Sequence, residues 1–102
     1  MVNKADVLVR LFETIEKSSK EDTTKSYTAK LLTEAKVKCI EKLKEESLET
    51  VEAAEQDNAK QIIYESADLI YHLLVLWKKF DISADQIYAE LESREGKTGL
   101  RK

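Results

Sequence analysis

Five carboxylates stand in two short patterns that could hold a metal ion. They are Glu45, Glu46, Glu49, Glu65 and Asp68, spaced as E-E-x-x-E and then E-x-x-D. The second pattern runs directly into a nearly continuous apolar stretch, residues 69–77. Ionised groups at the edge of a buried segment are costly unless something cationic meets them. We therefore expect these acids to surround a cation, and a divalent metal ion is the simplest candidate.

The spacing within each pattern places the acids on shared helix faces. Glu46 and Glu49 are three residues apart, as are Glu65 and Asp68, so each pair lies on one side of a helix. If the two helices are antiparallel neighbours, four carboxylates meet at one point. Oxygen ligands without His or Cys favour Mg²⁺, with Mn²⁺ as a substitute. Because Mg²⁺ held by carboxylates usually takes phosphate oxygens from its substrate, the pattern predicts phosphate chemistry.

A second interpretation treats the same acids as a solvated helix face. In that case they would pair with nearby lysines, namely Lys42, Lys44 and Lys60. This interpretation explains Glu45, which points toward the outer side of its helix, and it also accommodates Glu46. It explains Asp68 poorly, because apolar residues flank Asp68 and no Lys or Arg lies within one helix turn. We therefore favour the metal site.

Composition limits both the fold and the classes of function. The chain has 102 residues, of which 36% are charged and 42% hydrophobic, with no Pro and two Gly, which is typical of a single all-α domain spanning residues 1–102. A net charge of -3 argues against nucleic-acid binding, and the longest apolar run is far below the roughly 20 residues that span a bilayer. A single Cys and no secretory signal sequence predict a cytoplasmic protein.

Apolar periodicity predicts four or five helices. We expect them over about 5–17, 27–56 and 59–80, with a last helix capped by Ser83 or Asp81. The polar residues 18–26 are expected to form a loop. The segment 27–56 is either one helix or is broken near 34–36, where no Pro or Gly forces a break. Its expected buried face is an arc of roughly 120° that contains Val37, Ile40, Leu43, Ser47, Val51 and Ala54.

The apolar stretch after Asp68 also predicts association. A helix that is apolar on every side must be enclosed by other helices or by another subunit. Since four or five helices of this size cover only part of such a surface, we expect a homodimer or a higher homo-oligomer. His72 lies within this stretch and is expected to be a packed core histidine rather than a general base.

Several blocks, in the same order along the chain, resemble one enzyme family. Besides the acidic pattern they are S-Y-T-A-K-L-L at 26–32, E-S-A-D-L-I-Y-H-L-L-V at 65–75 and I-Y-A-E-L-E-S-R at 87–94. Over roughly residues 26–100 the chain is similar to phosphoribosyl-ATP pyrophosphatases of histidine biosynthesis, which are MazG-type nucleotide pyrophosphatases. It departs from their pattern at Lys44, where many relatives carry Gly, and at 34–37, which replaces a Gly/Pro break.

The resemblance implies a MazG-like helical bundle completed by homodimerisation. It also implies hydrolysis of 1-(5-phosphoribosyl)-ATP to the corresponding AMP compound and pyrophosphate. The implied Mg²⁺ ligands are Glu46, Glu49, Glu65 and Asp68, and Glu45 would be a weaker ligand or a base that orients water. Phosphate contacts are expected from Ser26, Thr28 and Lys30, with Lys97 and Arg101 as closing contacts from the tail.

Two other functions remain open on the sequence. A house-cleaning pyrophosphatase for nucleoside triphosphates would share the acidic pattern, although the S-Y-T-A-K block favours the histidine-pathway enzyme. A non-catalytic helical dimerisation module would be indifferent to chelators and would tolerate loss of Asp68.

Overall fold

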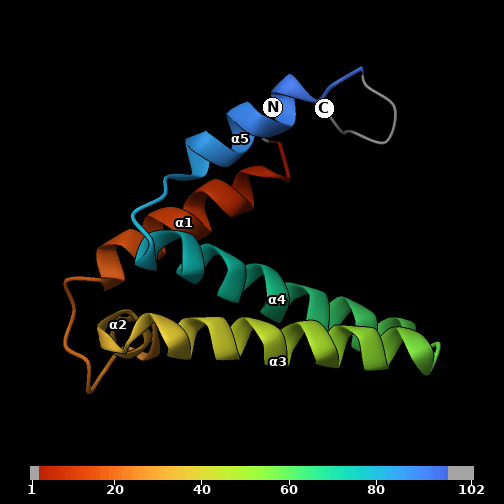
Figure 1. Ribbon diagram of the computed structural model, residues 1–102, viewed down its shortest axis with the longest axis horizontal. Coiled ribbons are helices and arrows are strands. Elements are labelled where there is room, and N and C mark those ends of the chain that lie inside the picture. Colours follow the sequence, from red (N-terminus) through yellow and green to blue (C-terminus); the bar gives the residue numbers. More distant parts are fainter. Residues whose placement is uncertain (1–2, 97–102) are drawn as a thin grey trace.

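The computed structural model describes residues 3–96, which form five helices (Figure 1). They are α1 (Asp6–Ser18), α2 (Tyr27–Thr33), α3 (Lys36–Glu55), α4 (Ala59–Lys79) and α5 (Ala84–Ser93). Residues 3–96 contain no strand, so the all-α prediction is confirmed. Within this range no helix has both the length and the apolar character that crossing a bilayer requires.

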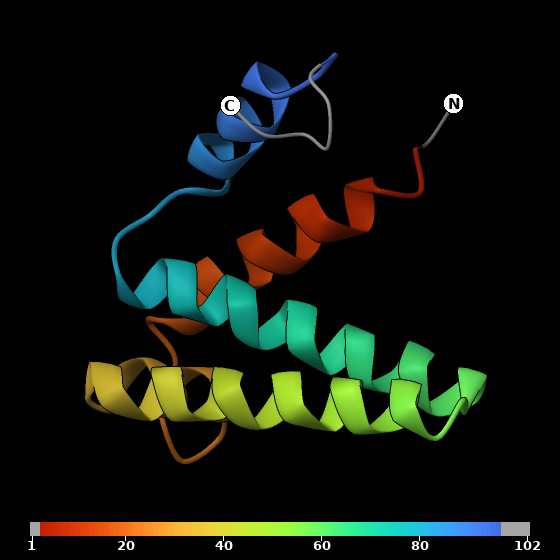
Figure 2. The same ribbon diagram turned by 45° about the vertical axis from the view of Figure 1, so that its right-hand side comes forward.

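Helices α3 and α4 form a long antiparallel hairpin that carries the acidic pattern (Figures 1 and 2). Residues 56–58 reverse the chain, and Asp57 there adopts a φ of 53°, in the left-handed region that Asp tolerates better than most residues. The side chain of Asn58 then accepts a hydrogen bond of 3.1 Å from the backbone N–H of Gln61 and so caps α4. The turn therefore brings the two acidic patterns onto neighbouring helices.

The segment from Tyr27 to Gln56 is broken, as one of the two sequence alternatives proposed. Glu34 and Ala35 are extended, with ψ of 164° and 152°, and separate α2 from α3. Two contacts from α4 hold α2 in place: Lys79 Nζ donates a 2.7 Å hydrogen bond to the Leu32 carbonyl, and the hydroxyls of Tyr71 and Thr28 are hydrogen-bonded. The break thus depends on tertiary contacts with α4 rather than on Gly or Pro.

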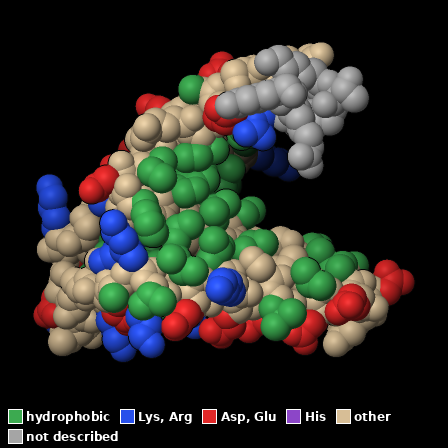
Figure 3. Space-filling view, in the orientation of Figure 1, with side chains coloured by type: hydrophobic (Ala, Val, Ile, Leu, Met, Phe, Trp, Pro, Cys, Tyr) green, Lys and Arg blue, Asp and Glu red, His purple; other side chains and the backbone are tan. Residues whose placement is uncertain are grey.

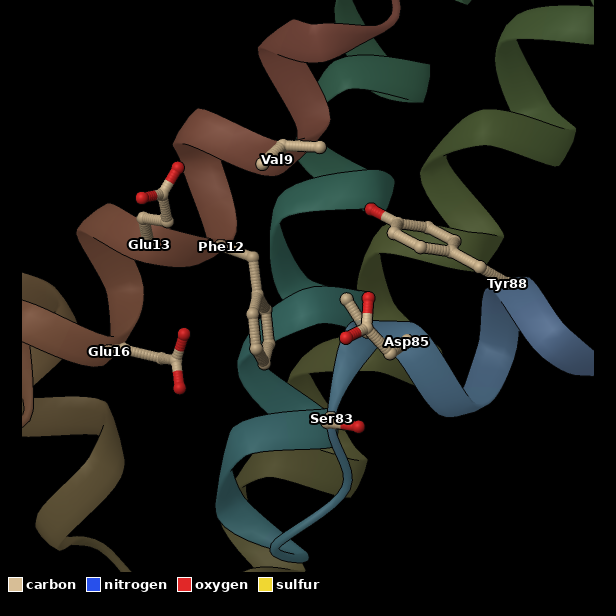
Figure 4. Close-up of a pocket in the computed structure, with 8 residues that line it drawn as sticks. Val9, Phe12, Glu13, Glu16, Ser83, Asp85 and Tyr88 are labelled. Atoms are coloured by element: carbon tan, nitrogen blue, oxygen red, sulfur yellow. The ribbon is translucent and has the colours of Figure 1, made fainter.

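The hydrophobic core lies where α1, α2 and α3 meet the second half of α4. It contains Phe12, Ile15, Leu31, Cys39, Leu74, Val75 and Ala84. Trp77 packs against this core, with its ring centroid 6.2 Å from that of Phe12. Helix α5 begins with a capping box between Ser83 and Gln86 and lies beside α1. A cleft of about 300 Å³ separates α5 from α1, with Phe12 and Tyr88 among its lining residues (Figure 4).

The buried face of α3 differs from the one that the apolar spacing predicts. Cys39, Glu46 and Ala53 are buried, whereas Val37 and Val51 are 54% and 53% exposed. The reason is that α4 and α2 are the only helices packed closely against α3 among the described residues, and they contact its small and acidic side. Most of the apolar arc of α3 is therefore left at the surface of a single chain, with Leu43 and Ser47 half-buried.

Candidate active site

The predicted acids meet between α3 and α4. Carboxylate oxygens of Glu46, Glu65 and Asp68 lie within 4.8 Å of one another, and so do those of Glu45, Glu46 and Glu49. Because Glu46 belongs to both groups, the two patterns form one continuous cluster. The antiparallel hairpin thus brings together all five acids that the sequence singled out.

Two of these carboxylates are withdrawn from water. Glu46 and Glu65 are only 7% and 8% exposed. The Oε2 atom of each is buried and has no hydrogen-bond partner among the described residues. A buried polar atom without a partner is costly and is rare in native proteins unless water or an ion completes it. The all-oxygen donor set and the two unpartnered atoms therefore fit a hard divalent cation such as Mg²⁺.

Crowding makes the cluster hold protons more tightly than isolated acids. A side-chain hydrogen bond with Glu49, together with burial and the charges of Glu49, Asp68 and Glu46, raises the pKa of Glu65 to about 7. Burial raises the pKa of Glu46 as well, and the charges of Glu49 and Asp68 add to the effect. Neighbouring acids cannot all ionise at little cost without a cation between them, so a divalent ion would displace protons as it binds.

Thr50 contacts the backbone of two residues of the cluster, a role that the sequence patterns do not predict. Its hydroxyl donates a 2.8 Å hydrogen bond to the carbonyl of Glu46 and also lies 3.4 Å from the carbonyl of Glu65. Thr50 therefore joins α3 to α4 at the level of the acids. The available sequence signal is weak, since a Thr four residues after an acid is common in helices.

His72 also contacts the cluster. As expected it is buried, but its Nε2 atom lies 3.8 Å from Glu46 Oε1, and the two side chains are 8% and 9% exposed. The rings of Tyr71 and Tyr27 meet the imidazole edge-on, with centroids 4.9 and 6.4 Å away. Burial lowers the pKa of His72, and the charge of Lys42 adds to this, whereas the charges of nearby acids act in the opposite direction. The sequence signal was its position four residues after Asp68, on the same helix face.

Glu45 occupies the outer edge of the cluster. It is exposed, and its Oε2 lies 3.6 Å from Lys42 Nζ. The solvated ion pair that the second sequence interpretation proposed therefore describes Glu45 well. It does not describe Glu46 or Glu65, which are buried.

The predicted phosphate contacts lie on or beyond α2. The Ser26 side chain accepts a backbone N–H and caps α2, while the Thr28 hydroxyl is hydrogen-bonded to α4. Lys30 is exposed and forms no ion pair with the cluster among the described residues. Lys97 and Arg101 lie outside the described residues.

Comparison with known proteins identifies the family. Residues 8–95 match the family described as Phosphoribosyl-ATP pyrophosphohydrolase, a span that includes all five acids. The chain belongs to this family. A relative from Nitrosomonas eutropha named phosphoribosyl-ATP pyrophosphatase is 41% identical over 100% of this chain and 87% of its own length. Relatives with the same name from Parvibaculum lavamentivorans and a Jannaschia species are 46% and 43% identical, covering 98% and 91% of this chain and 92% and 91% of their own lengths.

Proposed function

We propose that this protein hydrolyses 1-(5-phosphoribosyl)-ATP to 1-(5-phosphoribosyl)-AMP and pyrophosphate, the second step of L-histidine biosynthesis. The observation that carries the proposal is the pair of buried, unpartnered oxygens of Glu46 and Glu65 within the acidic pattern of a family member. We also propose that the enzyme works in the cytoplasm, a reducing compartment that suits the free and buried Cys39.

The proposed cofactor is Mg²⁺, with Glu46, Glu49, Glu65 and Asp68 as its ligands. When bound, the ion would polarise phosphate oxygens and offset the negative charge that develops during cleavage. The protein itself supplies the geometry of the ligands. Thr50 joins the two helices at this level, and His72 lies against Glu46 Oε1, which leaves Oε2 as the unpartnered atom of that carboxylate.

Glu45 is proposed to orient the attacking water. Its carboxylate is exposed to solvent, yet one of its oxygens lies within 4.8 Å of oxygens of Glu46 and Glu49. A general base needs access to water and a position near the reacting phosphate, and Glu45 combines exposure to solvent with a position beside the proposed metal ligands. Ser26, Thr28 and Lys30 remain the proposed phosphate contacts near α2, with Lys97 and Arg101 added from the tail.

We further propose that two copies of the chain form a homodimer. The Cα radius of gyration is 15.2 Å, whereas a compact domain of this length measures about 13 Å. Hydrophobic side chains form a broad patch over α1 and α4 on the face in Figure 3. Large apolar side chains are also exposed on α3 and α4, including Leu48, Val51, Ile63 and Tyr64, at 59%, 53%, 73% and 62%. Light scattering should give about twice 11.7 kDa, and the mass of a monomer would overturn this proposal.

The test of the activity is pyrophosphate release with Mg²⁺ across a panel of substrates. The panel contains phosphoribosyl-ATP, ordinary nucleoside triphosphates and modified triphosphates. We expect cleavage of phosphoribosyl-ATP and loss of activity with a chelator. Cleavage of modified triphosphates with phosphoribosyl-ATP ignored would instead identify a house-cleaning pyrophosphatase. If pyrophosphate is released from none of these substrates, the protein is instead a non-catalytic dimerisation module.

A further inference from the structure

A groove between α2 and α3 opens beside the carboxylate cluster. Its volume is about 330 Å³, within the range of about 300–1,000 Å³ that small-molecule sites occupy. Tyr27 lines it from α2, and Lys38, Lys42 and Glu45 line it from α3. Glu45 belongs both to this groove and to the acidic cluster. A ligand bound at the cluster could therefore extend directly into the groove.

The groove is more acidic than basic. Three carboxylates line it, those of Glu34, Glu41 and Glu45, against the two ammonium groups of Lys38 and Lys42. Lys38 pairs with Glu41, and Lys42 with Glu45, each at 3.6 Å. Glu34 forms no ion pair within residues 3–96. Such a surface is poorly suited to a triphosphate but suits a ring that carries positive charge.

Tyr27 adds an exposed aromatic ring to this acidic surface. The residue is 53% exposed, although Tyr is commonly more buried than this. An edge-on contact with His72, at an interplanar angle of 88°, orients the ring. His72 in turn lies against Glu46, so Tyr27 is linked to the cluster through a single side chain. An oriented aromatic face beside carboxylates is the usual arrangement for binding a flat organic cation.

We propose that this groove binds the N1-substituted adenine ring of the substrate and thereby distinguishes phosphoribosyl-ATP from ATP, an inference that rests on the proposed function. Substitution at N1 makes adenine an amidinium-type cation at neutral pH, whereas the adenine of ATP is neutral. The Tyr27 ring stacks on this cation, and Glu34 accepts a hydrogen bond from its exocyclic amino group. The triphosphate then lies toward Glu45 and the metal ligands.

The test compares two nucleotides that differ by one methyl group and one charge. Calorimetry measures the affinity of the full-length protein for 1-methyladenosine 5′-monophosphate and for AMP. We expect 1-methyl-AMP to bind about tenfold more tightly than AMP. Tyr27→Ala should remove this preference, whereas Tyr27→Phe keeps an aromatic face and should retain it. The matched control is Tyr64→Ala, which removes another exposed Tyr, 62% exposed on α4, that does not line the groove.

Equal affinity for the two nucleotides in the wild type would overturn the inference, as would an unchanged preference in Tyr27→Ala. Kinetics separate this failure from failure of the proposed function. If the wild type cleaves phosphoribosyl-ATP and Tyr27→Ala keeps the wild-type KM, the function stands and the groove assignment is wrong. If the groove prefers 1-methyl-AMP but phosphoribosyl-ATP is not cleaved, the proposed function fails and the groove remains a site for N1-alkylated adenines. We expect a raised KM with little change in kcat.

Discussion

Replacing Glu46 by Gln should stabilise the metal-free protein and at the same time remove its response to Mg²⁺. Oxygens of Glu46, Glu65 and Asp68 lie within 4.8 Å of one another. Two unit charges at that distance repel by roughly 3.5 kcal/mol at an effective dielectric constant of about 20. Partial protonation of the cluster relieves some of this repulsion. We therefore expect Glu46→Gln to raise the free energy of unfolding by about 1–3 kcal/mol near pH 8. Each kcal/mol corresponds to an increase in Tm of about 4–8 °C for a domain of this size.

The pH dependence follows from the direction of the pKa shifts. The pKa of Glu65 is about 7 in the folded, metal-free protein against 4.5 for an isolated Glu, so between these values the folded state holds a proton that the unfolded chain has lost. Unfolding therefore releases protons in this pH range, so a rising pH favours the unfolded state. The wild type loses stability as pH rises from about 4.5 through 7. Glu46→Gln removes one repelling neighbour of Glu65 and should make this loss smaller. Urea unfolding followed by circular dichroism, with a chelator present, measures both quantities.

The same measurement with saturating Mg²⁺ completes the experiment. A ligand that binds only the folded state stabilises it, so the wild type should gain stability and Glu46→Gln should gain little. The control is Glu55→Gln, an exposed carboxylate of α3 that belongs to neither acidic group, which should change stability by less than about 0.5 kcal/mol and keep the Mg²⁺ response. The reasoning is refuted if Glu46→Gln is less stable than the wild type near pH 8 without metal. It is also refuted if the variant keeps the full response to Mg²⁺.

Glu49→Gln and Asp68→Asn should each lower the turnover of phosphoribosyl-ATP by about a hundredfold or more while the circular dichroism remains helical. Near-normal turnover in either variant would exclude that residue from the metal site. Because His72 positions Glu46, His72→Phe should weaken Mn²⁺ binding about 10–100-fold in a spectroscopic titration, and His72→Gln should stay closer to the wild type. Unchanged Mn²⁺ affinity in His72→Phe would mean that His72 only fills space in the core. Ile15 is 1% exposed, and Ile15→Ala should lower the free energy of unfolding in urea by about 2–5 kcal/mol. A loss below about 1 kcal/mol would contradict the place of Ile15 in the core.

The acidic set could be predicted because its geometry is local. Residues three apart on a helix share a face wherever that helix lies in the protein, so the pairs Glu46–Glu49 and Glu65–Asp68 follow from spacing alone. The helices could be predicted for a similar reason, since periodicity and capping residues such as Asn58 and Ser83 act over a few positions. The break after α2 could not be predicted in this way, because Lys79 of α4, far away in the sequence, holds α2 through a hydrogen bond to one of its carbonyls.

The amino-acid sequence by itself thus determined the family, the all-helical fold and the five acids that converge. Only the tertiary structure decided that Glu46 and Glu65 are the buried members, that His72 lies against Glu46, and that Tyr27 and Glu34 share a groove with Glu45. It also decided that most of the apolar arc of α3 is exposed in one chain. The physical reason is that burial, pKa and cavity shape depend on which other helix lies opposite a residue, and that choice is made by contacts between segments far apart in the chain.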